Sequence, residues 1–257
     1  MTELLSGADS IESLLRRCEA SPSRVEMWID IILAAGVTRM AEVGVYRGEF
    51  AEAVLRQCPE VARYYMVDPW RHLSDWNKPS NAEDDRFAQF LAEVKAKTEF
   101  AATRRVILRG TTTEVIDQVA DGELDFVYID GDHTLRGISI DLIRCYSKVR
   151  VGGLIGGDDF TPNMWQHKSS FEPTLVFPFA VYFAEAVGAK VYALPHGQFC
   201  IQKSEDLKFA FVDLTGRYGE LALRSQVAPE SMLKLYLRER FPWFMGVVSR
   251  VAGFRRS

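Results

Sequence analysis

The sequence predicts an α/β fold, with a mostly parallel seven-stranded sheet, helices on both faces, N-terminal helices and a C-terminal helical extension. Short apolar runs alternate with longer amphipathic stretches along most of the 257 residues, a pattern typical of βαβ units. Several apolar runs end directly in Gly or Asp, as strands often do beside a ligand site. With 47% hydrophobic and 26% charged residues, the chain can bury a core without disulfides.

Seven apolar runs are short enough to be strands and are followed by turn residues or amphipathic stretches. We expect strands at Arg39–Val45, Arg63–Val67, Arg105–Leu108, Asp125–Ile129, Gly153–Ile155, Lys190–Leu194 and Gln198–Gln202. Between the first five lie patterns of helical period near residues 48–58, 83–101, 112–119 and 134–148. Strands alternating with helices of this length indicate a parallel sheet covered on both faces.

The regions before and after the sheet have helical patterns of their own. Residues 9–19 and 23–35 place apolar side chains at helical spacing, which favours packing on the sheet, with a dimer contact as the alternative. We therefore divide the chain into an N-terminal helical segment (1–36), a central domain (37–203) and a basic helical extension (204–257).

The end of the chain differs in charge from the rest. Residues 231–257 contain six Lys or Arg and one Glu, so the preceding residues have a net charge of −9 although the whole chain has −4. The segment is also rich in Trp, Phe and Leu. Its apolar side could pack on the domain or on a second subunit, or the segment could make peripheral contact with an anionic membrane.

Composition narrows the class of protein. A mildly acidic chain is unsuited to coating nucleic acid, and no apolar stretch approaches the roughly 20 residues of a membrane span. The four cysteines lie far apart, with no close pair for zinc or redox chemistry. The N-terminus does not have the pattern of a secretory signal. We expect a cytoplasmic protein that acts on small molecules.

The first two strand ends indicate an adenosine-type cofactor. The first strand leads into Glu42-x-Gly44-x-x-x-Gly48, and the second ends at Asp68, 24 residues after Gly44. Nucleotide-binding folds place a ribose-binding carboxylate at about this distance. The glycine spacing differs from the G-x-G-x-x-G of dinucleotide sites. The acidic surroundings suit S-adenosylmethionine, which has a sulfonium cation and an ammonium group.

Acidic residues follow the fourth and fifth strands. Asp130 and Asp132 lie in Asp130-Gly131-Asp132-His133, and Asp158 and Asp159 follow Gly156-Gly157. Because neighbouring strands lie about 5 Å apart, we expect three of these carboxylates, Asp130, Asp158 and Asp159, to converge. Close carboxylates repel one another unless a cation intervenes, and oxygen-only ligation suits Mg²⁺.

Together these motifs resemble class I S-adenosylmethionine-dependent methyltransferases. The closest resemblance is to metal-dependent O-methyltransferases that act on sugars of polysaccharides and natural products and on catechols, and it covers about residues 36–203. It implies a Rossmann-like methyltransferase fold. It also implies that Glu42, Gly44 and Gly48 line the methionine part of the cofactor, that Asp68 holds the ribose, and that Asp130, Asp158 and Asp159 hold Mg²⁺. The cofactor-contacting residues predicted beside these motifs are Tyr46, Trp70, Thr111 and Asp130.

Methyl transfer to a hydroxyl requires a group that removes the proton. His133 stands where catechol-type relatives have a lysine, and Asp132 is the competing base. A third possibility is activation by the metal without a protein base. Two long loops, one with His72 and Trp76 and the other with Trp165 and His167, could form lids over the substrate.

The sequence thus predicts an O-methyltransferase that uses S-adenosylmethionine and Mg²⁺ and modifies a sugar hydroxyl of a polysaccharide, an oligosaccharide or a glycosylated natural product. A catechol-like acceptor is the first alternative. A nicotinamide-dependent oxidoreductase and a non-catalytic binding protein are the others. A homodimer is also expected.

Overall fold

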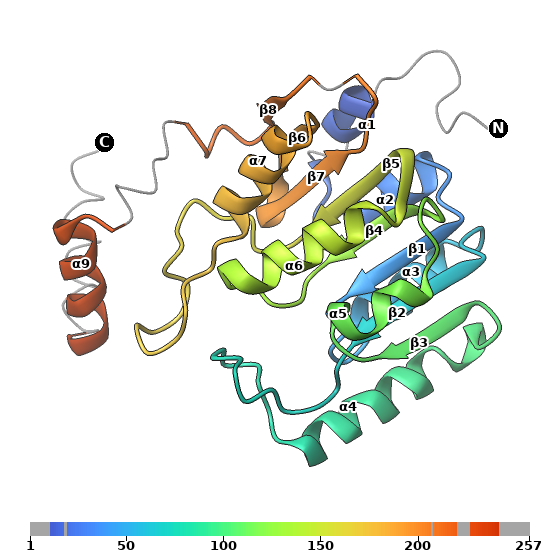
Figure 1. Ribbon diagram of the computed structural model, residues 1–257, viewed down its shortest axis with the longest axis horizontal. Coiled ribbons are helices and arrows are strands. Elements are labelled where there is room, and N and C mark those ends of the chain that lie inside the picture. Colours follow the sequence, from blue (N-terminus) through green and yellow to red (C-terminus); the bar gives the residue numbers. More distant parts are fainter. Residues whose placement is uncertain (1–10, 18–19, 207, 220–226, 242–257) are drawn as a thin grey trace.

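The structure is a computed structural model, and it describes residues 11–17, 20–206, 208–219 and 227–241. Within these residues eight strands form one sheet in the order β3-β2-β1-β4-β5-β7-β6-β8 (Figure 1). The strands are β1 (Arg39–Val43), β2 (Arg63–Asp68), β3 (Arg105–Arg109), β4 (Leu124–Ile129), β5 (Val149–Gly157), β6 (Lys190–Leu194), β7 (Gln198–Gln202) and β8 (Ala210–Asp213).

Helices cover both faces of this sheet. In Figure 1, α5, α6 and α7 lie in front of it and α1, α2 and α3 behind it. The helices are α1 (Ile11–Arg17), α2 (Arg24–Ala34), α3 (Glu49–Gln57), α4 (Asp84–Lys97), α5 (Thr112–Val115), α6 (Leu135–Tyr146), α7 (Val176–Ala186) and α9 (Pro229–Arg240), with 3₁₀ turns η2 (Glu99–Ala101), η3 (Ile116–Gln118) and η4 (Pro195–Gly197).

The strand pairing confirms the predicted fold class. β1 to β5 are parallel, and β7 runs antiparallel between β5 and β6. The order reverses at β1, which has β2 on one side and β4 on the other. Ligands of open α/β sheets bind at such a switch point, beyond the carboxyl ends of the strands.

Two elements were not predicted. β8 pairs parallel to β6 inside the segment that we expected to be wholly helical. Its four half-buried residues are too few to show a strand period. Helix α7 is also absent from the predicted elements, because VFPFAVYFAEA is apolar nearly all round and shows little amphipathic contrast.

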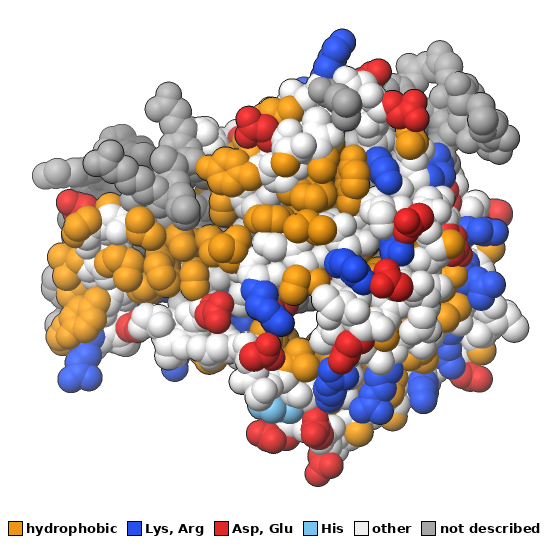
Figure 2. All heavy atoms as spheres, viewed as in Figure 1, with side chains coloured by type: hydrophobic (Ala, Val, Ile, Leu, Met, Phe, Trp, Pro, Cys, Tyr) orange, Lys and Arg blue, Asp and Glu red, His pale blue; other side chains and the backbone are white. Residues whose placement is uncertain are grey.

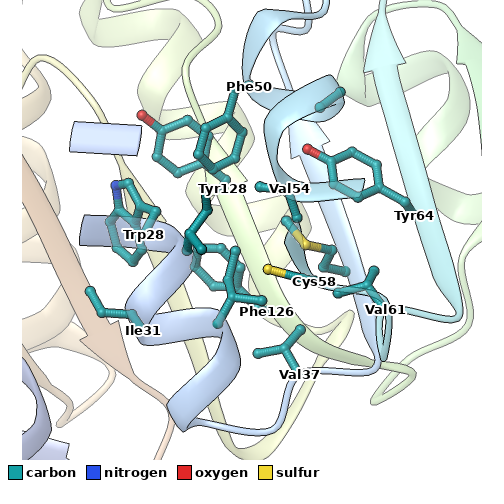
Figure 3. Packing of buried hydrophobic residues seen from close by; sticks show 14 of the residues in the cluster. Trp28, Ile31, Val37, Phe50, Val54, Cys58, Val61, Tyr64, Phe126 and Tyr128 are labelled. Carbon is teal, nitrogen blue, oxygen red and sulfur yellow. The ribbon is translucent and has the colours of Figure 1, made fainter. Parts of the chain in front are cut away.

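The N-terminal helices belong to the core, as the packing alternative predicted. Trp28 of α2 is fully buried and stacks on Phe126 at a ring distance of 5.1 Å. Figure 3 shows it beside Phe126 and Tyr128, with residues of α3 on the other side. A Cβ on Gly156 would lie 2.2 Å from the Trp28 ring. One glycine of the Gly156-Gly157 pair is therefore required by helix packing.

The described part of the C-terminal segment ends in α9. Its Leu233 and Tyr236 side chains are more than half exposed, and hydrophobic side chains gather over this helix in Figure 2. Of the predicted basic segment 231–257, residues 242–257 lie outside the described residues. In the described ranges no helix has the length and apolar character needed to span a membrane.

Candidate active site

One cavity of about 830 Å³ lies at the carboxyl ends of β1, β2 and β4. This volume is within the range of small-molecule sites, roughly 300 to 1,000 Å³. Most of the site residues predicted from the sequence line it, namely Glu42, Gly44, Tyr46, Asp68, Thr111, Asp130, Asp132, His133 and Asp159. The fold thus brings together residues separated by more than a hundred positions in the chain.

Glu42 is the most deeply buried acid of the cavity. Its side chain accepts a hydrogen bond of 2.8 Å from the Tyr64 hydroxyl, and the residue is only 2% exposed. Burial is the main cause that raises the pKa of Glu42 to about 8, and the nearby charges of Asp130 and Asp68 add to the effect. The carboxyl group is therefore neutral at pH 7 until a cation enters beside it.

Gly44 is required by the contact between β1 and β4. Its backbone has φ +90°, and a Cβ there would lie 2.1 Å from the carbonyl oxygen of Asp130. The Asp130 amide donates to the Val43 carbonyl at 2.7 Å, which holds the two strand ends together. At this point the cavity is lined by backbone, and the two strand ends are too close for any side chain at position 44.

Asp68 closes the turn after β1. It accepts hydrogen bonds of 2.8 Å from the backbone amides of Tyr46 and Trp70, one on each carboxylate oxygen. Burial nevertheless raises the pKa of Asp68 to about 6. Tyr46 and Trp70 both have positive φ, 52° and 40°, a conformation that non-glycine residues rarely adopt. Asp68 thus fixes two strained turns at the edge of the cavity.

Three predicted site residues do not line the cavity. Gly48 begins α3 with φ +76°, and a Cβ there would meet Val94 of α4 at 3.0 Å, so it serves helix packing. Trp70 is fully buried and donates its indole N–H to the Tyr46 carbonyl at 2.9 Å. Asp158 is not among the lining residues, and Gln198 donates to it at 2.5 Å.

A buried acid beside Thr112 was not predicted from the sequence. Asp141 of α6 lines the cavity and accepts a hydrogen bond of 2.5 Å from the Thr112 hydroxyl. Burial raises the pKa of Asp141 to about 7, with a further increase from Asp132. The available signal was an acid on the apolar side of a predicted helix, where such residues are rare unless paired.

Basic side chains already contact the predicted metal ligands. Nη1 of Arg24 lies 3.0 Å from Oδ2 of Asp130 and is in direct contact with Oδ2 of Asp158. His133 contacts Asp159 through Nδ1, and its Nε2 lies 3.4 Å from Asp130. Arg24 was not predicted, because an arginine in the first turn of an amphipathic helix is usually solvent-facing.

Carboxylate oxygens are chemically suited to Mg²⁺, but their arrangement does not fit a metal ion. Throughout the part of the chain that the structure describes, no group of three His, Cys, Asp or Glu side chains is arranged to hold one. The carboxylates of Asp130 and Asp158 point to Arg24, and that of Asp159 points to His133. The Mg²⁺ requirement stays a prediction.

His133 lies between two of these acids. Burial lowers its pKa, but hydrogen bonds and charge from Asp130 and Asp159 outweigh burial and raise the pKa to about 9. Apart from the 3.4 Å contact with Asp130, its buried Nε2 has no partner. An imidazole in this position can hold a proton beside the cavity and direct one ring nitrogen at a second group.

Asp132 lines the cavity and also accepts hydrogen bonds that hold the start of α6 and a loop residue. It accepts hydrogen bonds of 3.0 Å from the amide and hydroxyl of Thr134, at the start of α6. It also accepts one of 3.0 Å from the Trp76 indole. Gly137 allows this position, since a Cβ there would lie 2.2 Å from Asp132.

The two long loops meet at the cavity. Lys78, after β2, is buried and donates to the Glu172 carbonyl at 2.9 Å, and burial lowers its pKa. Trp76 and His167 line the cavity, as the lid prediction expects, but Trp165 does not. Glu239 of α9 accepts hydrogen bonds from Ser169, so the C-terminal helix supports the second loop.

Comparisons with known proteins concern the family and the fold. A family model described as a methyltransferase domain matches residues 41–160, the stretch from β1 to the residue after Asp159. No curated protein matches the sequence.

Two solved structures have a similar fold. The cofactor-bound Rv0187 from MTB is 14% identical, with 79% of this chain and 93% of that one covered and a TM-score of 0.51. A candidate caffeoyl-CoA O-methyltransferase from Staphylococcus aureus is 12% identical, with 76% and 93% covered and a TM-score of 0.52. At these identities the likeness concerns the fold. The family match identifies residues 41–160 as a methyltransferase domain, and the whole described chain has the Rossmann-like α/β fold of class I S-adenosylmethionine-dependent methyltransferases.

Proposed function

We propose that the protein transfers a methyl group to a hydroxyl oxygen of a small sugar or a glycosylated small molecule. The observation that supports this best is one cavity lined both by the buried Glu42 and by His133 and Asp132. The first can receive a cationic cofactor, and the others can receive a hydroxyl proton. A structural relative named for O-methyltransferase activity supports oxygen as the acceptor atom.

The cavity wall favours a polyol over a flat apolar acceptor. Beside Trp76 it presents side chains of both signs from the loops and α6, namely Arg71, Asp75, Lys78 and Arg136. Such groups suit the many donors and acceptors of a sugar, and an indole can cover its apolar face. A catechol-like acceptor remains the alternative.

Binding and charge define the roles of the cofactor residues in this proposal. When bound, S-adenosylmethionine would supply the methyl group of its sulfonium. The sulfur would keep the electron pair of the broken carbon–sulfur bond and become the thioether of S-adenosylhomocysteine. Glu42 binds its ammonium group, and Asp68 binds the ribose. The backbone at Gly44 allows close approach, and Thr111 and Thr112 lie at the adenine end, with Asp141 beside them.

Proton transfer involves His133 or Asp132. The acceptor oxygen must lose its proton as it bonds to the methyl carbon, so a base has to lie within hydrogen-bond reach. His133 is the first choice: its Nε2 has only the long contact of 3.4 Å with Asp130, and the base is the neutral imidazole. Asp132 accepts three hydrogen bonds already. No step is assigned to the predicted Mg²⁺, because its ligands contact Arg24 and His133.

We expect His133→Ala to lower kcat by about a hundredfold or more, since positioned bases contribute roughly 10² to 10⁴. Affinity for S-adenosylhomocysteine should stay within about threefold, and Asp132→Asn should have the smaller effect on kcat. A labelled-methyl assay over small polyols and glycans measures turnover. His72→Ala changes a histidine in an exposed loop position and is the control. Unchanged turnover of His133→Ala would exclude it as the base.

The quaternary structure and cellular site belong to the same proposal. A homodimer, a cytoplasmic location and contact of the basic tail with a membrane or a partner all stay predictions. Light scattering of the full chain measures whether it is a dimer. Flotation with anionic vesicles, compared between the full chain and a chain ending at Ser231, measures membrane contact of the tail.

A further inference from the structure

Arg24 connects the N-terminal helix to the carboxylates at the end of the sheet. It is the first residue of α2, after the N-cap Ser23. Its Nη1 contacts Asp130 and Asp158 and lies 3.5 Å from the Tyr128 hydroxyl. The side chain is 37% exposed, and the two carboxylates are about one-fifth exposed. The Arg24 guanidinium therefore bridges the two carboxylates on their exposed side.

The helix that presents Arg24 is held rigidly. Trp28, one turn later, donates its indole N–H to Oε1 of Gln198 at 2.8 Å. Gln198 is fully buried, and its amide nitrogen donates to Oδ1 of Asp158. Two residues of one helix face thus fix Asp158, one directly and one through Gln198. A side chain held by such partners loses little conformational freedom when it binds.

Both oxygens of Asp158 already have partners. Oδ1 accepts from the Asp159 amide at 2.7 Å and from Gln198, and Oδ2 contacts Arg24. A divalent ion could bind this carboxylate only by displacing the guanidinium. Three carboxylates that close repel each other without a cation, and here the Arg24 guanidinium is the cation that faces Asp130 and Asp158.

We propose that Arg24 is a positioning residue that takes the place of the divalent cation predicted from the sequence. Its guanidinium holds Asp130 and Asp158 at the end of the cavity, so the enzyme binds no metal ion there. A guanidinium has several donors in a fixed plane and keeps its charge at any physiological pH. The metal-binding test of this inference is independent of the proposed acceptor.

Direct metal binding is the first test. We expect wild-type protein to leave the electron paramagnetic resonance signal of free Mn²⁺ unchanged. Arg24→Ala uncovers two adjacent carboxylates, so this variant should bind one Mn²⁺ per chain. The signal of free Mn²⁺ should fall by the corresponding amount. Adding Asp158→Asn to Arg24→Ala should restore the free signal. The proposal would be overturned if wild-type protein bound one Mn²⁺ and Asp158→Asn alone abolished that binding. This holds whatever the Arg24 variants do.

Turnover gives a second readout. We expect wild-type activity to survive exhaustive chelation. Arg24→Ala should lose about tenfold in kcat with chelator present, as when a partner that orients site residues is removed, and should regain activity with Mg²⁺. Arg24→Lys should stay metal-independent. Arg56→Ala, which removes an exposed arginine paired with Glu52 on α3, is the matched control. Chelation that abolishes wild-type activity would contradict the inference.

Discussion

Glu42→Gln is expected to stabilise the ligand-free protein at pH 7 by about 3 kcal/mol. The reason is that the pKa of Glu42 is raised by burial from 4.5 to about 8. In the unfolded chain the carboxyl group ionises near pH 4.5, while in the folded protein it keeps its proton up to about pH 8. Stability therefore falls as pH rises between these values, by roughly 1.4 kcal/mol per pH unit.

Denaturant unfolding at several pH values measures this effect. The difference between Glu42→Gln and wild type should vanish near pH 4 and grow up to about pH 8. Glu49→Gln is the matched control, because Glu49 also lines the cavity but has a side chain 63% exposed. A constant difference between pH 5 and 8 would show that the buried carboxyl group is not the source.

The same substitution should weaken binding of S-adenosylhomocysteine, which keeps the ammonium group, by about a hundredfold. If Glu42 receives that group, binding ionises it and releases a proton at pH 7. Calorimetry in two buffers of different ionisation heat measures the release, which Glu42→Gln should abolish and Glu49→Gln should not. Equal proton release in wild type and Glu42→Gln would place the ammonium elsewhere.

Gly44→Ala is expected to destabilise the fold by more than about 3 kcal/mol. A Cβ at this position would lie 2.1 Å from the Asp130 carbonyl oxygen and 2.6 Å from the Cα of Gly131. Both are backbone atoms, so relief requires the ends of β1 and β4 to separate. Costs of this size arise where overpacking adds to an unfavourable φ.

Gly122→Ala separates these two causes. Gly122 has φ +70°, close to the +90° of Gly44, but no atom lies within 4 Å of its Cβ position. It should cost only about 1 kcal/mol, the effect of a left-handed conformation alone. Thermal or denaturant unfolding of both variants gives the comparison. Similar losses would mean that the close approach of the two strands is unimportant for stability.

The sequence predicted the site best where acidic side chains stand at the carboxyl ends of strands. Glu42 and Asp68 lie at the ends of β1 and β2, Asp130 and Asp159 follow β4 and β5, and the topology of a parallel sheet alone places such positions at one edge. Their presence in one cavity was therefore predictable. The roles of Gly48 and Trp70 were not, because a helix-packing glycine and a buried indole have the same local sequence as cofactor contacts.

The side chains that neutralise the acids were beyond sequence reasoning. Arg24 precedes Asp130 by 106 residues, and its helix has an apolar face that explains the helix without it. Only the packing of Trp28 against Gly156 determines where α2 starts relative to the strand ends. Sequence periodicity predicts a helix and its buried face, but not the depth at which its first turn docks.

The eighth strand has a consequence for how the molecule can be shortened. β8 covers the outer edge of β6, and the chain after it returns so that the Tyr218 hydroxyl bonds to the Phe160 carbonyl, next to Asp159. A protein ending at residue 203 would leave a bare sheet edge, which is prone to pair with other chains. It would also lose that hydrogen bond. The smallest autonomous catalytic unit therefore extends at least to Tyr218.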